Sequence, residues 1–438
     1  MSNSTYSAAA LQRLERSDPD VFQALMHEEV RQSEGIELIP SESYCFPEVY
    51  ALLGSVFNNK YSEGYPGRRY YGGQENTDVV ETLARDRAKK LFRAEYANVQ
   101  PLSGSPMNQA VYFALLQPGD TVLAMDLTHG GHLTHGAPVS HMGKVFTFVR
   151  YKSELPSGKI DLNKVRALAL KHKPRMILCG FSSYPRELDY AGFKKIADEI
   201  GALTMADVSH LGGLIAGDAL ANPMDFGFDV MTTTTHKSLR GPRGGIILCK
   251  KQHGPAIDKS VFPGLQGGPH MHQIAALATT LKLAATDDFK AYARNVIANA
   301  KTLAATFLEG KADLVTGGTD NHMMVCNTVN SFGFTGDVAE KALDAAGITL
   351  NKQLVPDDPN PPMKPSGIRF GTPAATSRGM GETEMKQLGD LMLRALHTVE
   401  DTAGLATLRE ETRAICSRFP VPGITIDGNS AKKRCCAA

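Results

Sequence analysis

The run MTTTTHKSLRGPRGG brings one lysine, Lys237, to the end of a strand-like series of threonines, where a turn rich in Gly and Pro follows. An amine held at the end of a buried strand is displaced from water, which lowers its pKa and suits it to Schiff-base chemistry. Lysines beside turns are more often simply solvated. Lys237 is therefore a catalytic candidate that needs the rest of a site around it.

A carboxylate, Asp207, follows the apolar run LTMA at the end of an earlier predicted strand. In open α/β sheets, ligands bind at the carboxyl ends of the strands. A carboxylate at that edge could pair with a protonated pyridine nitrogen, which is the partner that pyridoxal phosphate requires of a protein. The competing interpretation is that Asp207 caps the next helix.

The segment PLSGSPMNQAVYFALLQPGD predicts a helix with Ser105 as its N-cap, Pro106 at its first position and an end at the QPG sequence. Ser103, Gly104 and Ser105 would offer hydroxyls and free amides to a phosphate at the positive end of the helix dipole. An ordinary capped helix is the alternative. The sequence contains neither GxxxxGK[ST] nor GxGxxG, so a nucleotide-phosphate site is not indicated.

Two further segments carry polar groups that could act on a ligand. HGGHLTHG spaces His129, His132 and His135 at intervals of three, which suggests zinc. The paired glycines disfavour a helix that would align these rings, and neither HExxH nor an acidic cluster accompanies them, so a ring stacked on a cofactor is the competing use. IRFGTPAATSRG places Arg369 after a short apolar run, where it could grip a substrate carboxylate or form a surface ion pair.

The elements that must position these groups follow from the apolar pattern between about residues 98 and 250. The β-rich runs are TVLAM at 121, KVFTFV at 144, RMILCGF at 175, LTMADV at 203, DVMTTTT at 229 and GGIILCK at 244. They alternate with helical patterns such as DLNKVRALALKHK and AGFKKIADEIGA. Continuously apolar strands are buried on both faces, so we expect an α/β fold with a mainly parallel sheet flanked by helices.

Three regions are expected along the chain: an N-terminal arm over 1–60, a large cofactor domain over 61–285 and a smaller α+β domain over 286–438. The Tyr- and Gly-rich stretch 60–78 reads as a functional loop, too rich in turn residues for a helix. Two long helical patterns occupy roughly 273–309. The tail GNSAKKRCCAA reads as a frayed, solvated terminus rather than a targeting signal.

Composition excludes several classes of partner. The 438 residues contain 47 Lys and Arg against 46 Asp and Glu, so nothing in the net charge favours nucleic acid or an anionic membrane. The seven cysteines form no CxxC or zinc-finger spacing, which favours a reducing compartment. We find no signal sequence and no long apolar span, and we expect a soluble, cytoplasmic protein without a membrane partner.

Taken in order, the motifs resemble one family, serine hydroxymethyltransferase, whose members are fold-type I enzymes that use pyridoxal 5'-phosphate. The resemblance runs through ELIPSES, YSEGYPGRRYYGG, LSGSPMNQAVYFALLQPGD, HGGHLTHG, ADVSHLGGL, TTTTHKSLRGPRGG, FPGLQGGPHMH and GIRFGTPAATSRG, which span nearly the whole chain. It implies reversible conversion of serine and tetrahydrofolate to glycine and 5,10-methylenetetrahydrofolate. The cofactor would be joined to Lys237 as an aldimine, and no metal is expected.

The resemblance also assigns roles to residues and an assembly to the chain. The catalytic residues would be Lys237, Glu63, His132, Asp207 and Tyr71. Cofactor contacts would come from Ser103, Gly104, Ser105, His132, Ser182, Asp207, His210, His236 and Lys237, with Tyr61, Gly267 and Gly268 from the neighbouring subunit. Substrate would bind Ser41, Arg369, Glu63 and Tyr71, and folate Glu63, Tyr70, Leu127, Gly131 and Gln353. The protein would be an obligate homodimer with shared active sites, and two dimers could pair into a tetramer.

Three rival functions stay open from the sequence. The nearest is a folate-independent pyridoxal-phosphate aldolase or hydroxymethyltransferase acting on α-methylserine or another β-hydroxy amino acid. The others are a metal-dependent hydrolase built on the three histidines and a catalytically silent binding protein. Four positions depart from the family pattern: Ser43 and Gln353 stand where Asn is usual, Ser209 where Ala is usual, and Leu265 where Gly is usual. Of these, Gln353 bears on folate binding and Ser209 on the cofactor pocket.

Overall fold

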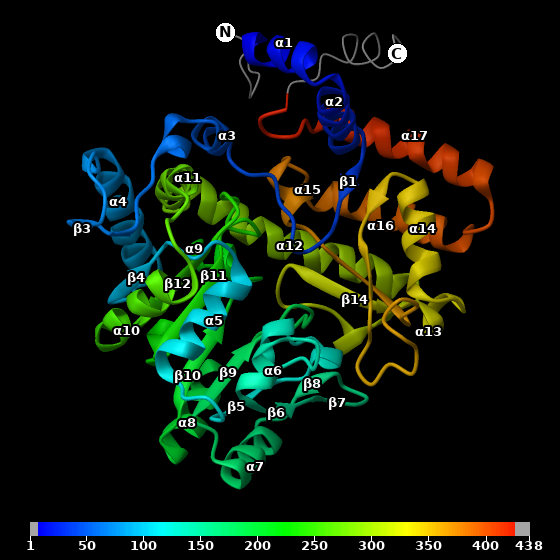
Figure 1. Cartoon of the computed structure of the whole chain (residues 1–438). Coiled ribbons are helices and arrows are strands. Elements are labelled where there is room, and N and C mark those ends of the chain that lie inside the picture. The colour runs from blue at the N-terminus through cyan, green and yellow to red at the C-terminus, as the bar shows by residue number, and fades with distance from the viewer. Residues whose placement is uncertain (1–7, 425–438) are drawn as a thin grey trace.

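A central sheet of seven strands organises the chain (Figure 1), and the computed structural model describes residues 8–424. In spatial order the strands are β4 (Tyr96–Asn98), β12 (Gly245–Cys249), β11 (Val230–Thr234), β10 (Leu203–Asp207), β9 (Met176–Gly180), β5 (Thr121–Met125) and β6 (Thr147–Tyr151). Strand β12 is antiparallel to both of its neighbours, whereas β11, β10, β9, β5 and β6 run parallel. The predicted α/β fold with a mainly parallel sheet is confirmed.

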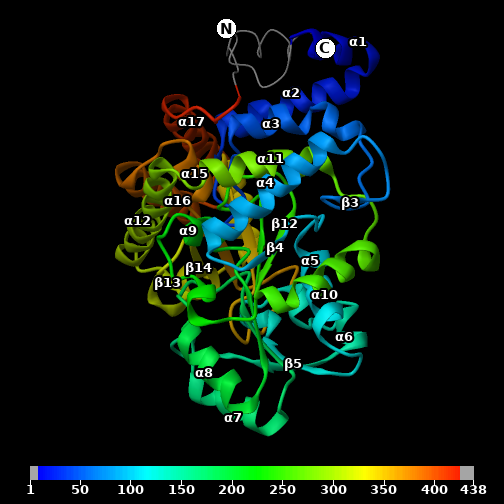
Figure 2. The same cartoon turned by 90° about the vertical axis from the view of Figure 1, so that its left-hand side faces the viewer.

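Both faces of this sheet are covered, which explains why its strands read as continuous apolar runs. Alternate residues of β5 enter different apolar clusters: Val122 and Ala124 on one face, Leu123 and Met125 on the other. The first face is covered by α5 (Gly104–Leu115), α6 (Met142–Val145) and α10 (Gly254–Lys259). The second is covered by α4 (Glu75–Phe92), α7 (Leu162–His172), α8 (Tyr190–Ile200), α9 (Gly212–Ala216), α11 (Met271–Leu283) and the start of α12 (Asp287–Glu309). Figure 2 shows α5 and α10 on one side of the strands and α9 and α12 on the other.

A second, antiparallel sheet lies in the C-terminal part of the chain. Its strands are ordered β13 (Asp313–Leu314), β14 (Met323–Asn327), β17 (Gly367–Gly371) and β16 (Asn351–Gln353). It shares an apolar cluster with α12, α14 (Gly336–Ala345), α16 (Glu382–His397) and α17 (Thr402–Arg418). Two short helices, α13 (Thr328–Phe332) and α15 (Pro373–Ser377), complete this part. Its mixture of strands and helices agrees with the expectation for the region after residue 286.

The beginning of the N-terminal arm packs against this second part, whereas its end packs against α11. Helices α1 (Ala8–Ser17) and α2 (Pro19–Glu34) lead into β1 (Ile36–Glu37), which pairs in parallel with β15 (Ile348–Thr349). Helix α3 (Pro47–Leu53) and the 3₁₀ turn Val56–Asn59 follow. Two small hairpins complete the strands: β2 (Gly64–Tyr65) with β3 (Arg68–Arg69), and β7 (Ser153–Glu154) with β8 (Lys159–Ile160). The boundaries expected at residues 60 and 285 stay predictions.

Three local expectations were wrong. The N-cap of α5 is Ser103 rather than Ser105, because Ser103 is the last residue with an extended backbone and Gly104 already turns into the helix. Helix α4 begins at Glu75, inside the stretch expected to be a loop; acidic residues in a first turn favour a helix start there. The run KVFTFV begins in α6, and its strand starts only at Thr147.

Among residues 8–424, no helix is long and apolar enough to cross a membrane. The basic, Cys-containing tail after residue 424 lies outside the described residues.

Candidate active site

Four parallel strands deliver the expected residues to one edge of the sheet. Asp207 is the last residue of β10, and Lys237 follows β11 after a short link. Ser182 follows β9 in the same way, and the histidine-rich segment follows β5. Since the carboxyl ends of parallel strands meet at one edge, residues far apart in sequence come together there. The expectation that Asp207 and Lys237 lie at this edge is confirmed.

Asp207 is buried and accepts hydrogen bonds from three neighbouring residues. Its Oδ2 accepts from the Nδ2 of Asn108 at 2.8 Å and pairs with the Nε2 of His135 at 3.0 Å. Its Oδ1 accepts from the amide and the hydroxyl of Ser209 at 3.1 and 2.6 Å. Burial raises the pKa of Asp207, but the hydrogen bond and charge of His135, aided by Ser209, hold that pKa well below its usual range. The carboxylate is therefore ionised and aimed by its donors.

Asp207 does not cap the next helix, since α9 has Leu211 as its N-cap. The capping interpretation of Asp207 was wrong.

The amine of Lys237 is the candidate nucleophile of the site. It forms neither a hydrogen bond nor an ion pair with another residue of the described part of the chain. Burial lowers the pKa of Lys237 from 10.5 to about 8; the charge of Asp207 opposes this shift, while Arg369 and Arg243 add to it. An amine with this pKa is substantially neutral near pH 8, so Lys237 can attack a carbonyl.

The three histidines of HGGHLTHG separate into two environments. His129 is drawn away from the site by hydrogen bonds to Ser153 and Asp357, each at 3.0 Å. His132 and His135 stay near Asp207, and a ligand atom from each of the three residues lies within 4.8 Å of the others. Such spacing is compatible with a metal, but the Asp207 oxygen is already bound to His135 Nε2. The zinc hypothesis on His129, His132 and His135 together was wrong, because His129 faces other partners.

His132 is suited to lie on an aromatic ring rather than to carry charge. Its Nδ1 is engaged by Thr134, whose hydroxyl lies 2.8 Å away. Burial, followed by the neighbouring charge of His135, lowers the pKa of His132 to about 4. A neutral imidazole held by one edge keeps its face free for stacking.

The start of α5 lies against the end of β11, beside His236. A side chain at Gly104 would come within 2.9 Å of the methyl group of Thr234, so only glycine allows this approach. The first amide of α5 to donate along the helix is that of Met107, to the Ser103 carbonyl, which leaves the amides before it available. His236 Nδ1 is buried, and it finds no hydrogen-bond partner within residues 8–424. These free donors fit a phosphate group.

Arg369 reaches this edge from the second sheet. It lies on β17 and donates to the Ser182 carbonyl at 2.5 Å and twice to Asn351 Oδ1 at 3.1 Å. Burial lowers its pKa to about 10. The alternative of a surface ion pair was wrong: Arg369 has neutral partners and no carboxylate among the ion pairs of the described chain. Its charge is therefore available to an anionic ligand.

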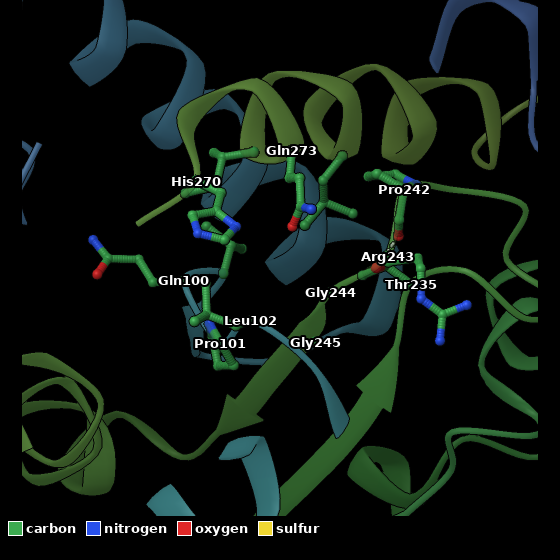
Figure 3. Close-up of a pocket in the computed structure, with 13 residues that line it drawn as sticks. Gln100, Pro101, Leu102, Thr235, Pro242, Arg243, Gly244, Gly245, His270 and Gln273 are labelled. Carbon is green, nitrogen blue, oxygen red and sulfur yellow. Dashed lines mark hydrogen bonds between the residues drawn. The ribbon is translucent and has the colours of Figure 1, made fainter. Parts of the chain in front are cut away.

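Two hollows flank the turn that follows Lys237. The larger, about 330 Å³, is lined by Ser41, His236 and Arg243 together with part of the N-terminal arm. The smaller, about 10 Å³, has room for roughly one water molecule. Figure 3 shows His270 and Gln273 reaching into it from the α11 side, toward Pro101, with Arg243 at the other side of the view. Only the larger hollow could admit part of a ligand.

A second cluster gathers the residues expected from the neighbouring subunit. Tyr61 donates to Glu63 Oε1 at 3.3 Å and packs edge-on against Tyr71 with ring centroids 5.1 Å apart. A Cβ at Gly267 would lie 3.2 Å from Glu63 Oε1, and one at Gly268 would lie 3.3 Å from the Tyr61 ring. The cluster is exposed, with Tyr61 at 56%. Its hairpin strand β3 lies at the outer edge of the molecule in Figure 1, away from β14.

The residues expected to bind folate are spread over three places. Tyr70 is 75% exposed beside the second cluster and packs on Phe262. Leu127 and Gly131 belong to the segment after β5, where a Cβ at Gly131 would come within 2.2 Å of the Met125 carbonyl oxygen. Gln353 ends β16, and its amide donates to the carbonyl of Leu354 at 3.2 Å. Among residues 8–424, no hydrogen bond or ring contact brings these five residues together within one chain.

Sequence reasoning missed three residues that hold the site, Asn108, Asn351 and His322, and considered His135 only as a metal ligand. Asn108 and His135 fix Asp207, and Asn351 fixes Arg369. His322 stacks on His210 with ring centroids 5.6 Å apart, and a 3.4 Å contact joins Nδ1 of His210 to Nε2 of His322. Asn108 lies on the buried side of a helix that had been recognised, which is a usable signal. The other contacts join segments that only the tertiary structure brings together.

The site combines a partly buried lysine, an ionised aspartate, a helix N-terminus and a histidine whose buried Nδ1 has no hydrogen-bond partner among residues 8–424. These groups fit the aldehyde, the ring nitrogen and the phosphate of pyridoxal phosphate. Fold and site thus define a pyridoxal-phosphate enzyme of fold type I. The family model described as serine hydroxymethyltransferase matches residues 14–392. The chain is 52% identical to the serine hydroxymethyltransferase of Desulfotalea psychrophila over 415 residues, which cover 95% of this chain and 97% of the relative.

A second relative gives the same result. The serine hydroxymethyltransferase of Desulforapulum autotrophicum is 52% identical over 404 residues, which cover 92% of this chain and 96% of the relative. The chain belongs to the serine hydroxymethyltransferase family. The resemblance predicted from the motifs is thereby confirmed, and with it an enzyme rather than a silent binding protein.

Proposed function

We propose that this chain interconverts serine and glycine with tetrahydrofolate as the one-carbon acceptor, through a site centred on Lys237. Family membership supports the reaction. The observation that carries the site is the lysine amine itself: it lies near the charges of Asp207 and Arg369, forms no hydrogen bond or ion pair within residues 8–424, and has its pKa lowered to about 8. Pyridoxal phosphate, when bound, supplies an electron sink for charge that develops at the substrate α-carbon.

The chain's own residues hold that group by its distinct polar parts. Ionised Asp207 would favour a proton on the ring nitrogen, because a buried carboxylate attracts positive charge. His132 would stack on the ring. The helix start of Ser103, Gly104 and Ser105, together with His236, would hold the phosphate, and Ser182 and His210 would hold the phenolic oxygen. A neutral His210 suits this role, since burial and the charge of Lys237 hold its pKa well below the usual value.

Arg369 and Ser41 bind the carboxylate of the amino-acid substrate. A guanidinium held by two neutral acceptors keeps a fixed direction, and its buried charge attracts a carboxylate strongly. Fixing the carboxylate fixes the orientation of the remaining bonds at the α-carbon, which decides the bond that breaks. The serine substrate therefore needs both the charge and the direction of Arg369.

The exposed cluster completes the site of a second copy of the chain. Tyr61, Gly267 and Gly268 would meet the partner's cofactor, while Glu63 and Tyr71 would act on the partner's substrate. Glu63 would move a proton to or from the hydroxymethyl group or folate. Folate would bind Glu63, Tyr70, Leu127, Gly131 and Gln353, drawn from two chains. We therefore expect an obligate homodimer with shared sites, and two such dimers could pair into a tetramer. We also expect a cytoplasmic protein, with domains over 1–60, 61–285 and 286–438.

Serine cleavage with and without tetrahydrofolate tests the reaction. Wild type is expected to turn serine over with a strong dependence on folate, and Lys237→Ala to lose the turnover. Lys251→Ala, which removes an exposed lysine, is the matched control and is expected to behave as wild type. Strong cleavage of serine or α-methylserine that ignores folate would instead identify the folate-independent rival.

A further inference from the structure

The hydrogen-bonding capacity of Asp207 is already filled. A carboxylate offers about four lone-pair directions, two on each oxygen. Oδ2 receives Asn108 Nδ2 at 2.8 Å and His135 Nε2 at 3.0 Å. Oδ1 receives the Ser209 amide at 3.1 Å and the Ser209 hydroxyl at 2.6 Å. A ring nitrogen that brings its own N–H to Asp207 must therefore share the carboxylate with one of these donors.

Two of the side-chain donors are locked in place. His135 Nδ1 accepts from the amide of His132 at 3.1 Å, which assigns the proton of His135 to Nε2, toward Asp207. Asn108 is oriented by the hydroxyl of Thr232, which donates to its Oδ1 at 2.9 Å and so turns the NH₂ group toward Asp207. Neither donor can turn away without breaking a second hydrogen bond.

The Ser209 hydroxyl is the donor that can give up its hydrogen bond to Asp207. Its amide is part of the backbone and stays, but a hydroxyl hydrogen rotates about the C–O bond. The hydroxyl also accepts a 3.3 Å hydrogen bond from the amide of Thr234, and this contact survives the rotation. Ser209 is buried at 7% exposure, so water does not replace the hydrogen bond it gives to Asp207.

We infer that Ser209 is a positioning residue whose hydroxyl competes with the ring nitrogen of the cofactor for Asp207. This competition lowers the affinity of the chain for the cofactor. The inference rests on the proposed function. Removing the hydroxyl acts twice in the same direction: it frees one acceptor position on Oδ1, and it makes the carboxylate a stronger acceptor, because one charge-assisted donor is gone.

Titration of the apoprotein with pyridoxal phosphate, followed by the absorption of the bound cofactor, tests this inference. Ser209→Ala is expected to bind about three- to tenfold more tightly than wild type, which is the range of one hydrogen bond gained. With ¹⁵N-labelled cofactor, the ring nitrogen in Ser209→Ala is expected to resonate closer to the fully protonated position. A merely structural loss at residue 209 would not move that resonance in this direction.

Ser260→Ala is the matched control, because Ser260 is also a buried hydroxyl donor but gives its hydrogen bond to the carbonyl of Ala110. Its cofactor affinity is expected to equal that of wild type. Equal or weaker binding by Ser209→Ala would overturn the inference and show that the hydroxyl supports the carboxylate instead. A wild-type chain that binds no pyridoxal phosphate at all would overturn the proposed function, which is a separate and recognisable result.

Discussion

The charges around Lys237 predict opposite shifts of its pKa in two variants. In wild type, burial dominates and lowers the pKa from 10.5 to about 8. Lowering the pKa from 10.5 to about 8 makes the ratio of neutral to charged amine about 300 times larger than in a solvated lysine. Asp207→Asn removes an anion that favours the charged amine, so the pKa falls further. Arg369→Gln removes a cation, so the pKa rises.

Trace acetylation of the apoprotein measures these values directly. Acetic anhydride reacts only with neutral amines, and peptide mass spectrometry reports each lysine separately between about pH 6 and about pH 11. Labelling of Lys237 in wild type is expected to rise to a plateau with a midpoint near 8, while exposed Lys251 in the same sample provides the reference. A midpoint above 10 for Lys237, or shifts of the same sign in both variants, would refute the electrostatic reasoning.

Three further outcomes test other parts of the structure. Glu81→Ala removes the fully buried carboxylate that lies 2.6 Å from Arg69 Nη2 and leaves only the more exposed Asp78 paired with this guanidinium. The substitution should lower the free energy of unfolding in urea by about 1.5–3 kcal/mol, the range for a hydrogen bond between charged groups, and a loss below about 0.5 kcal/mol would contradict it. Burial raises the pKa of Glu37 to about 8, so the native state keeps a proton that the unfolded chain loses above its value of 4.5. The stability that the protonated Glu37 contributes is complete below pH 4.5 and is lost as the pH rises through 8. Glu37→Gln should therefore raise the melting temperature at pH 9 and not at pH 4. Equal shifts of the melting temperature at both pH values would count against this explanation. Lys237→Ala and Glu63→Gln, each inactive alone, should regain activity when co-expressed, because one site of the mixed dimer is then intact; an inactive mixture would exclude shared sites.

The sequence was sufficient for those features that depend on local pattern and strand order. The runs TVLAM and LTMADV were correctly predicted as the strands β5 and β10, because a strand buried on both faces is a continuous apolar run in the sequence. Asp207 and Lys237 could be placed together because parallel strands end at a common edge. The start of α5 was misplaced by two residues, since Ser103 and Ser105 are equally good caps and only the backbone decides between them.

The features that could not be predicted depend on contacts between distant segments. His135 binds Asp207, while His129, in the same motif, turns toward Asp357 on another segment. Nothing in the spacing HGGHLTHG distinguishes the two histidines. The contact of His210 with His322 likewise joins the segment after β10 to the segment before β14, and neither residue lies in a local pattern that predicts this contact. Long-range polar contacts of this kind carry no periodic signal.

Reduction of the purified protein with borohydride, followed by peptide mapping, tests the central claim most directly. Borohydride fixes a pyridoxal group irreversibly to the amine that carries it. We expect a pyridoxyl group on the peptide that contains Lys237 and an unmodified Lys251 peptide from the same digest. A pyridoxyl group on another lysine, or none on any lysine after incubation with pyridoxal phosphate, would contradict the role of Lys237.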